Sequence, residues 1–518
     1  MCEDLWCLIS NALHKRPAHV AWICRLLEGK CRQYSYQQVY DYAVAFASHL
    51  RERQVAQGDV IGILAVNGPE WGIAASAVWK LGGVVAPLHT GFSDDELVNA
   101  LNAINPKLVL VHGVDRLVTH GMGILLDDNP ERIARESKLQ AKISGAQEAI
   151  RSYTSGSSGH PKMVRLSHSN IISNVTTACQ CADITDHERF LSLLPLSHMM
   201  EVTGGFLLPL YSGSTIVLPR VLASKEILDA MGDERVTAMI GVPRLYRNIM
   251  QGLEKRFRQA GPLMVWYRAL LKKCPPWLRR RINWPIRRKL GGRVNAWISG
   301  GSRLDPEIAQ YFRDLGLPLR QGYGLTETSP VMCIQDNFEP VLDSVGRPLA
   351  GVKVKIADRD ASGSGELLVK GPNVMMGYVD PEQTREALRD GWFRTGDLAR
   401  LDEAGNVILT GRCKRLIVTE AGKNVYPEEL ETLLERIPGV KEAGVLEVEM
   451  RPAVVMALDD EDATPEAARA ILKEFNARAS SHNHVIRFAL VDELPRTPVG
   501  KVAFNRLPEI FADRENND

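Results

Sequence analysis

A stretch rich in hydroxyl groups and glycine, YTSGSSGHPK, occupies residues 153–162 and ends on a lysine. Glycine lets the backbone approach a ligand closely, successive backbone N–H groups can bind an anion, and Lys162 adds a positive charge. Pro161 and Met163 exclude the P-loop pattern G-x-x-x-x-G-K-[ST]. The stretch predicts a phosphate-binding loop of another kind, with a flexible serine-rich surface loop as the alternative. Its candidate phosphate-binding residues are Thr154, Ser155, Gly156, Ser157, Ser158, Gly159 and Lys162.

A single carboxylate, Glu327, lies among hydroxyl groups in QGYGLTETSP, residues 321–330. One carboxylate beside Thr326 and Thr328 suits a Mg²⁺ ion that keeps most of its waters and contacts a nucleotide phosphate. The alternative is an exposed turn before Pro330. The segment therefore predicts a magnesium site of low protein ligand number.

Two further groups suit a nucleotide. Asp397, in a Thr-Gly-Asp sequence that predicts a turn, can accept two hydrogen bonds from a ribose diol, and Arg412 can hold the same ribose or a phosphate. Lys501 lies in PRTPVGKV near the C-terminus, where a lysine on its own is usually only solvated.

The elements expected to position these groups alternate between strands and helices. Residues 60–66 predict a strand, 70–81 a helix and 84–88 a second strand. Further strands are predicted at 107–113, 214–219, 236–241 and 294–300. This rhythm favours an α/β fold with largely parallel sheets, and a small α+β domain follows it. We place the boundary near Gly411, giving domains of residues 1–410 and 411–518.

The composition is that of an ordinary globular protein. Of 518 residues, 45% are hydrophobic and 24% charged, and the formal net charge is +1, so the overall balance predicts no nucleic-acid partner. The N-terminus lacks the basic region and apolar core of a secretory signal, which favours a cytoplasmic location. Nine scattered cysteines predict free thiols in a reducing compartment.

Residues 255–293 differ from this average, because they contain many Lys and Arg residues and no Asp or Glu. Trp266, Trp277 and Trp284 are interspersed among the charges. Basic and aromatic residues together suit an anionic membrane surface or a polyanionic ligand. The alternative is a solvated helical hairpin whose tryptophans pack on the main body of the protein.

Five motifs in order carry a family resemblance: YTSGSSGHPK, QGYGLTET, GWFRTGDL, GRCKRLIVTEAGKNVYPEELE and PRTPVGKV. Their order and spacing resemble those of the adenylate-forming superfamily, which includes acyl-CoA synthetases, luciferases and the adenylation domains of peptide synthetases. The resemblance covers nearly the whole chain. PLSHMMEV and TEAGKNVYPEELE, with the long segment between GVPRLYRNIM and ISGG, are most similar to long-chain fatty acyl-CoA synthetases.

The resemblance implies ATP, Mg²⁺ and CoA as the chemical partners of a lipophilic acid. The 154–162 loop would follow the pyrophosphate, while Thr326 and Glu327 would handle the α-phosphate and Mg²⁺. Asp397 and Arg412 would hold the ribose, and Lys501 would stabilise the charge that builds as carboxylate and α-phosphate join. The residues expected around adenine are Gly300, Gly301, Ser302, Gln321, Gly322, Tyr323 and Gly324.

The resemblance also implies a C-terminal lid domain that rotates between two half-reactions. Lys414 matches its pivot, and Gly422 matches the lining of the pantetheine channel. The acyl site would include Pro195, Leu196, Ser197 and His198, with His198 as its gate. No carboxylate suited to pair with an amino group is evident there, so a medium- to long-chain fatty acid or a similarly lipophilic acid is expected.

Two positions depart from the family pattern. Met163 replaces a glycine that usually follows the loop lysine, and Asn406 replaces a common aromatic residue. Neither removes a charged group that the chemistry requires. Two alternatives remain: an acyl-AMP ligase that delivers to a carrier-protein phosphopantetheine or closes a lactone from a hydroxy acid, and a catalytically silent binding protein. A homodimer and a peripheral location at the inner membrane surface are further expectations.

Overall fold

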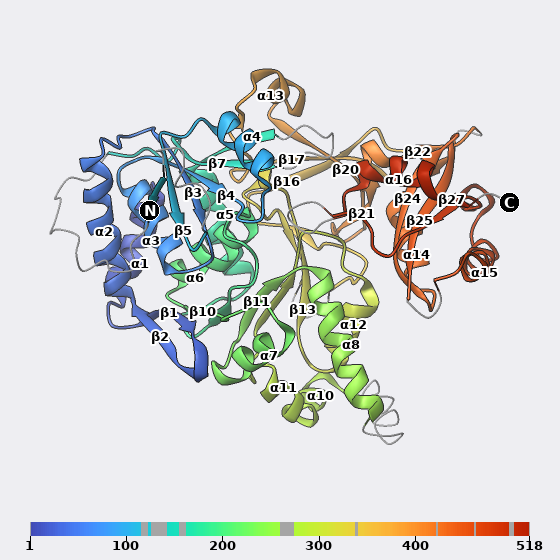
Figure 1. Ribbon diagram of the computed structural model, residues 1–518, viewed down its shortest axis with the longest axis horizontal. Coiled ribbons are helices and arrows are strands. Elements are labelled where there is room, and N and C mark those ends of the chain that lie inside the picture. Colours follow the sequence, from blue (N-terminus) through green and yellow to red (C-terminus); the bar gives the residue numbers. More distant parts are fainter. Residues whose placement is uncertain are drawn as a thin grey trace. The chain divides into compact units, whose positions relative to one another are not determined.

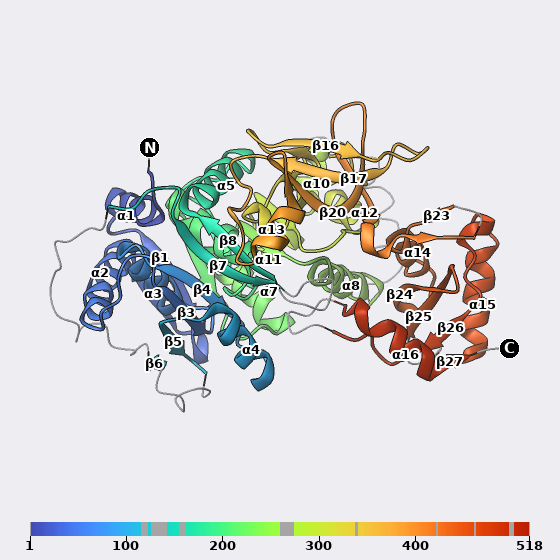
Figure 2. The same ribbon diagram turned by 90° about the horizontal axis from the view of Figure 1, so that it is seen from above.

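The computed structural model describes residues 2–114, 123–125, 142–154, 162–259, 274–336, 340–420, 423–459, 463–496 and 502–516 (Figures 1 and 2). The chain forms two compact units. The first contains Met1–Thr154, Lys162–Lys353 and Lys370–Gly391, and the second contains Val354–Val369 and Trp392–Asp518. The strands from Trp392 onward thus pack with the second unit. The predicted boundary between residues 410 and 411 refers to the part of the chain that would rotate as a lid, and it stays a prediction.

A nine-stranded sheet forms one half of the first unit. Its central strands are parallel, and the edge strands β2, β14 and β15 run antiparallel to their neighbours. In spatial order the strands are β15 (Arg347–Pro348), β14 (Cys333–Ile334), β13 (Leu319–Tyr323), β12 (Ala296–Ser299), β11 (Ala238–Gly241), β9 (Arg189–Leu191), β10 (Thr215–Leu218), β1 (Val20–Arg25) and β2 (Cys31–Ser35).

A seven-stranded sheet forms the other half. Its order is β18 (Gly377–Tyr378), β8 (Lys162–Ser167), β7 (Glu148–Thr154), β4 (Val84–Leu88), β3 (Val60–Ala65), β5 (Leu108–His112) and β6 (Gly123–Leu125). β3 and β4 are buried along their whole length, as continuous apolar runs predict for parallel strands covered on both faces. The predicted α/β class with largely parallel sheets is confirmed.

Buried helices lie between these sheets. Trp71 of α3 packs edge-on against Phe206, which also contacts Trp22 of the nine-stranded sheet. Gly72 permits this approach, because a Cβ there would lie 2.7 Å from Phe206. The helices of the first unit are α1 (Leu5–Lys15), α2 (Tyr36–Glu52), α3 (Pro69–Lys80), α4 (Asp94–Ile104), α5 (His168–Cys181), the π-helix η4 (Glu201–Leu207), α6 (Leu208–Ser212), α7 (Ser224–Asp233), α8 (Pro243–Gln259), α10 (Pro276–Ile282), α11 (Trp284–Lys289), α12 (Pro306–Asp314), the 3-10 helix η5 (Thr326–Thr328) and α13 (Pro381–Ala387).

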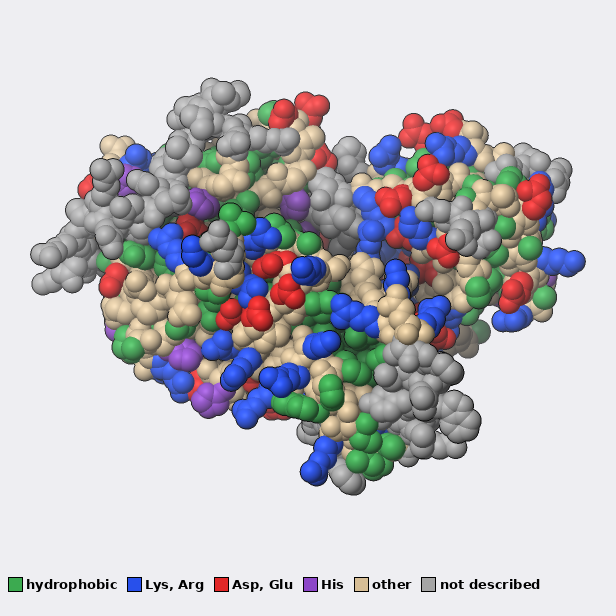
Figure 3. All heavy atoms as spheres, turned by 60° about the horizontal axis from the view of Figure 1, so that its bottom comes forward, with side chains coloured by type: hydrophobic (Ala, Val, Ile, Leu, Met, Phe, Trp, Pro, Cys, Tyr) green, Lys and Arg blue, Asp and Glu red, His purple; other side chains and the backbone are tan. Residues whose placement is uncertain are grey.

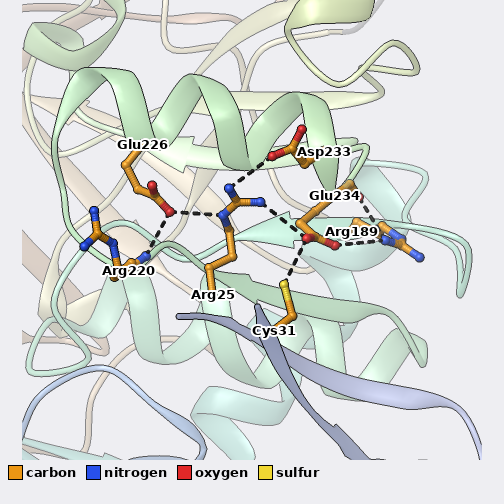
Figure 4. A network of polar contacts seen from close by, with 7 residues as sticks. All are labelled: Arg25, Cys31, Arg189, Arg220, Glu226, Asp233 and Glu234. Atoms are coloured by element: carbon orange, nitrogen blue, oxygen red, sulfur yellow. Dashed lines mark hydrogen bonds and ion pairs between the residues drawn. The ribbon is translucent and has the colours of Figure 1, made fainter. Parts of the chain in front are cut away.

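An ion network joins β1 to α7 (Figure 4). Arg25 lies between Glu226, at 3.0 Å from its Nε, and Glu234, at 3.4 Å from its Nη1. Its Nη2 is 3.1 Å from Asp233. Only 10% of the Arg25 side chain is exposed, so the network holds the helix to the sheet with little solvent screening.

The second unit contains an antiparallel sheet and a small α+β domain. Its strands are β16 (Lys353–Ala357), β17 (Gly365–Lys370), β20 (Trp392–Leu401), β21 (Val407–Arg412), β22 (Ile417–Val418), β23 (Asn424–Val425), β24 (Val440–Val448), β25 (Arg451–Leu458), β26 (Phe488–Leu490) and β27 (Glu515–Asn516). Its helices are the 3-10 helix η6 (Cys413–Arg415), α14 (Pro427–Leu434), α15 (Pro465–Asn476) and α16 (Leu507–Arg514). Helices α14 and α15 cover one face of the β24–β25 pair and α16 covers the other (Figure 2).

One local prediction is wrong. Thr395, Gly396 and Asp397 do not form a turn but lie within the continuous strand β20. Gly396 has φ +71°, and the pairing with β21 shifts register at Leu398, so the irregularity that glycine introduces is a bulge within a strand. A turn does form between β20 and β21, where Gly405 adopts φ +82°.

Candidate active site

The carboxyl ends of β11, β12 and β13 meet at one edge of the nine-stranded sheet. Ser299 pairs in register with Gln321 and with Gly241. Gly300 follows directly, and its N–H donates to the Gly241 carbonyl at 2.9 Å. The candidate adenine residues of 300–302 and 321–324 therefore lie on adjacent strands, at the edge where open α/β sheets bind ligands.

The loop after β13 folds back tightly on itself. A Cβ on Gly324 would lie 1.9 Å from the Pro330 carbonyl oxygen, so only glycine permits this approach. Between these residues η5 holds Thr326 and Glu327, and Thr328 closes the turn by donating its hydroxyl to the Leu325 carbonyl at 3.0 Å. A turn does precede Pro330, but the alternative of an exposed turn is wrong, because Thr328 and Ser329 are buried.

Two buried asparagines hold this loop from outside it. Asn174 of α5 donates to the carbonyl oxygens of Thr328 at 3.2 Å and Val331 at 2.5 Å. Asn373 donates to the same two oxygens, at 3.0 and 3.2 Å. Each asparagine is 1% exposed, and neither side-chain oxygen has a hydrogen-bond partner in the described part of the chain. A buried amide oxygen without a hydrogen-bond partner costs free energy of folding. We therefore assign the two asparagines the role of holding this loop in position.

Glu327 projects from this loop toward a tyrosine and a lysine. The Tyr378 hydroxyl donates to Glu327 Oε1 at 2.8 Å, and Lys162 Nζ lies 4.6 Å from the centroid of the Tyr378 ring. Burial and the neighbouring carboxylate raise the pKa of Tyr378, so its hydroxyl remains a donor at neutral pH. The tyrosine therefore links the predicted magnesium ligand to the predicted phosphate-loop lysine.

The phosphate loop itself is only partly described. Ser155, Gly156, Ser157, Ser158 and Gly159 lie outside the described residues, and so does the side chain of Thr154. Its two ends are fixed, because Thr154 of β7 pairs with Lys162 of β8. Met163 faces the other side of β8 and packs in a core with Leu88 and Phe92. The methionine that departs from the family pattern is therefore a core residue.

His198 lies at the end of a loop that follows β9. Its ring is 6.0 Å from that of His89, in an edge-on contact, and burial lowers the pKa of His89. The carbonyl of His198 accepts hydrogen bonds from the backbone N–H groups of Glu201 and Val202, both at 3.0 Å. The predicted gate residue thus leads directly into η4.

The second unit brings Asp397 and Arg412 together. They pair across β20 and β21, and Arg412 Nε lies 3.1 Å from the Asp397 carboxylate. The Asp397 side chain is 7% exposed and that of Arg412 48%, so the pair reaches the surface through the arginine. Lys414 is exposed on η6, two residues further on. Gly422 and Lys501 lie outside the described residues.

Sequence reasoning missed Tyr378, Asn174, Asn373 and Glu201. Asn174 had a detectable signal, because it occupies the apolar face of α5 with Ile171, Val175 and Ala178. A lone amide on an apolar helical face indicates a specific buried partner. Within the described residues no cluster of three or more His, Cys, Asp or Glu could hold a metal ion.

The sequence matches the family described as AMP-binding enzyme over residues 9–379. The chain belongs to this family. Among its relatives, the long-chain-fatty-acid–CoA ligase heimdall of Drosophila melanogaster is 30% identical over 74% of this chain and 65% of its own length. A feruloyl-CoA synthase of an Amycolatopsis species is 29% identical over 90% of this chain and 92% of its own.

A solved structure agrees with this family assignment. ATP-bound MatB of Rhodopseudomonas palustris superposes with a TM-score of 0.84 at 25% identity and covers 99% of both chains. The AMP-binding enzyme is therefore a member of the adenylate-forming superfamily, as predicted, and its class is that of the AMP-forming acid–CoA ligases. ATP, Mg²⁺ and CoA are the small molecules of that class.

Proposed function

We propose that this enzyme activates a lipophilic carboxylic acid, a medium- to long-chain fatty acid, and transfers the acyl group to CoA. The observation that carries the proposal concerns residues 195–212, 241–250 and 294–301, which by resemblance form the acyl site. Glu201 is their only carboxylate, it is 1% exposed, and burial raises its pKa to about 8. It therefore offers no negative charge to an ammonium group, whereas Met199, Phe206 and Leu207 provide apolar surface.

In the first step of this reaction, a carboxylate oxygen of the acid attacks the α-phosphorus of ATP and pyrophosphate leaves. In the second step, the CoA thiolate attacks the acyl carbonyl and AMP leaves. No enzyme nucleophile is required, so the protein orients the reactants and stabilises developing charge. Glu327 fits a magnesium ligand, since Tyr378 occupies Oε1 and no described residue donates to Oε2. The ion would neutralise phosphate charge, and Lys162 would bind the departing pyrophosphate.

The relatives named above differ in acid, one acting on fatty acids and one on ferulate by name, so the acid must be measured. Pyrophosphate release should be followed with C8–C18 fatty acids, ferulate and malonate, each with and without CoA. We expect acyl-CoA from the fatty acids alone. Turnover confined to ferulate or malonate would reject the lipophilic acid. Adenylate formation without CoA transfer would instead favour an acyl-AMP ligase that uses a carrier protein or forms a lactone.

We further propose that α10 and α11 contact an anionic membrane from which the acid is drawn. Trp284 is 50% exposed and Ile282 38%, and Arg281, Arg288 and Lys289 are exposed beside them. On this side of the molecule Lys and Arg side chains lie among hydrophobic ones (Figure 3). Basic side chains near an anionic surface contribute about 1 kcal/mol each, and an inserted tryptophan adds apolar contact. None of the described helices has the length and hydropathy of a membrane span.

Flotation with phosphatidylglycerol vesicles at low salt tests this contact, with phosphatidylcholine vesicles as the lipid control. The Arg288→Glu/Lys289→Glu variant should lose flotation, whereas Lys15→Glu/Lys30→Glu, with the same change in charge on exposed residues elsewhere, should keep it. Equal loss in both variants would reject a local contact. Binding would place a cytoplasmic protein at the inner membrane surface. A homodimer remains a separate prediction for sedimentation velocity.

A further inference from the structure

The helix that follows His198 contains an unusual turn. Helical backbone begins at Met199, widens into the π-helix η4, and ends as α6. All residues of η4 are buried. Single π turns inside α-helices are frequently found at functional sites. Because η4 lies within the proposed acyl site, we asked whether this turn has a role besides filling the core.

Glycine at two positions allows this turn to form. A Cβ on Gly205 would lie 2.4 Å from the Glu201 carboxyl group, and one on Gly204 would lie 2.4 Å from Ile240 of β11. A larger residue would displace the Glu201 carboxyl group at position 205 and the end of the Ile240 side chain at position 204. The turn is thus built so that Glu201 fits beside its own helix.

The Glu201 carboxyl group binds the loop that leads to His198. Ser192 Oγ lies 2.6 Å from Glu201 Oε1, and the backbone amides of Leu193 and Leu194 hydrogen-bond to the same carboxyl group. Asn67 holds this loop from the other sheet, because its side chain bonds to the Leu194 carbonyl at 2.6 Å and to the Leu196 N–H at 2.8 Å.

Two residues further along, η4 also contacts the loop of Glu327. The Thr203 hydroxyl donates to the Ser329 carbonyl at 3.2 Å. Thr203 is 1% exposed and Ser329 is 0% exposed, so no water competes for this bond. One helical turn therefore contacts both the loop of the acyl gate and the loop of the metal ligand.

We propose that η4 fixes these two loops relative to each other, with Glu201 and Thr203 as positioning residues for His198 and Glu327, respectively. The inference rests on the proposed function, since the two loops would hold the acid and the nucleotide. Glu201 performs this role without charge. No described Lys or Arg pairs with it, and burial without a cation disfavours the carboxylate. Glutamine, which has nearly the same shape, should then replace it.

Amide hydrogen exchange tests the proposal without knowledge of the acid. Glu201→Leu should speed exchange in residues 192–198 about 10-fold, as expected for a lost hydrogen-bond anchor, while Glu201→Gln stays within about 3-fold of wild type. Thr203→Val should speed exchange in 325–331 alone. Ser192→Ala removes one of the three hydrogen bonds from the loop side, so it should speed exchange in 192–198 to a smaller extent, and it serves if Glu201→Leu does not fold.

Matched controls come from the same elements. Glu188→Leu alters a buried acid at the opposite end of β9, and Thr176→Val removes a hydroxyl that bonds only within α5. Neither should change exchange in the two loops. Uniform exchange across the first unit in Glu201→Leu would overturn the positioning role. A Glu201→Gln variant as damaged as Glu201→Leu would overturn the uncharged assignment.

Kinetics add a second readout once an acid is known. Glu201→Leu should raise KM for the acid about 10-fold and leave KM for ATP nearly unchanged. Thr203→Val should raise KM for ATP and leave KM for the acid nearly unchanged. Equal changes in both constants would reject separate positioning. If the wild-type enzyme activated no fatty acid, the proposed function would be wrong. The hydrogen-exchange experiment would still test the positioning roles of Glu201 and Thr203, because it needs no substrate.

Discussion

The loop of Glu327 and the hairpin of Asp397 both contribute to the predicted nucleotide site, yet they are held in different ways. Two asparagines and Thr203 donate buried hydrogen bonds to the carbonyls of the Glu327 loop. Asp397 instead pairs with Arg412, which is half-exposed, across two strands.

This difference suits different tasks. A metal ligand must keep its position within a fraction of an ångström, and several buried hydrogen bonds supply that rigidity. The Asp397 side chain is 7% exposed but that of Arg412 is 48% exposed, so solvent partly screens the arginine and Asp397 can, as proposed, exchange it for the hydroxyl groups of a ribose. The first loop therefore suits the fixed geometry that the predicted metal ligand needs, and the hairpin suits the ligand exchange that is predicted there.

The largest effect is expected from Lys501 in the second unit. Lys501→Ala should lower the rate of acyl-AMP formation about 1000-fold, since it removes a charge that stabilises the transition state. Transfer from preformed acyl-AMP to CoA should persist, because the lid is expected to withdraw the lysine before that step. Stopped-flow assays of each half-reaction measure the two rates. Equal loss in both would refute the assigned role.

Within the first unit, Glu327→Gln should reduce adenylation about 100-fold or more, because the amide is a weaker magnesium ligand. Tyr378→Phe keeps the ring under Lys162 and removes only the hydroxyl, so about a 10-fold loss is expected. Magnesium titration of the initial rate separates the variants. A weaker effect of Glu327→Gln than of Tyr378→Phe would contradict the assignment of Glu327 to the metal.

The paired asparagines should show strong coupling. Each carbonyl keeps one donor when Asn174→Ala or Asn373→Ala is made alone, so each single variant should lose about 1 kcal/mol of stability. The double variant leaves both carbonyls unpaired, and its loss should exceed the sum of the two single losses. Urea unfolding measures the cycle, with Thr176→Val as control. Strict additivity would show that the two amides act independently.

The smallest effect is expected at the hairpin. Arg412→Ala should raise KM for ATP about 10-fold and lower the free energy of unfolding by about 1 kcal/mol, because the half-exposed arginine is partly screened by solvent but the buried Asp397 loses its cation. Steady-state kinetics and urea unfolding provide both numbers. A loss of stability comparable to that of the asparagine double variant would remove the contrast between the two regions.

Much of the framework was predictable from local pattern. The strand predicted at 60–66 is β3, the helix predicted at 70–81 is α3, and the small α+β domain predicted after them contains α14 and α15. In these segments the spacing of hydrophobic residues in the sequence matches the residues that are buried in the fold. The helix α16 and the strand β27 were not predicted, because both are short and lie in a polar tail.

The supporting contacts of the site were not predictable in the same way. Asn373 and Tyr378 come from a segment without a motif, and each touches the Glu327 loop across more than 40 residues of sequence. Such contacts depend on the order of the strands in the sheet, which a hydrophobic period does not specify. The turn predicted at Gly396 failed for a related reason, since glycine indicates an irregular backbone but not whether the strand continues.

Met163 has a consequence for how this sequence can change. The family pattern has glycine there, but in this chain the side chain fills the core beside Phe92 and Leu88. Returning to glycine would empty that space and cost about 2–5 kcal/mol, as for other large-to-small core substitutions. A change to glycine at this position would therefore need larger side chains at its neighbours to refill the core. The residue beside the phosphate loop is constrained by packing as well as by any role in the loop.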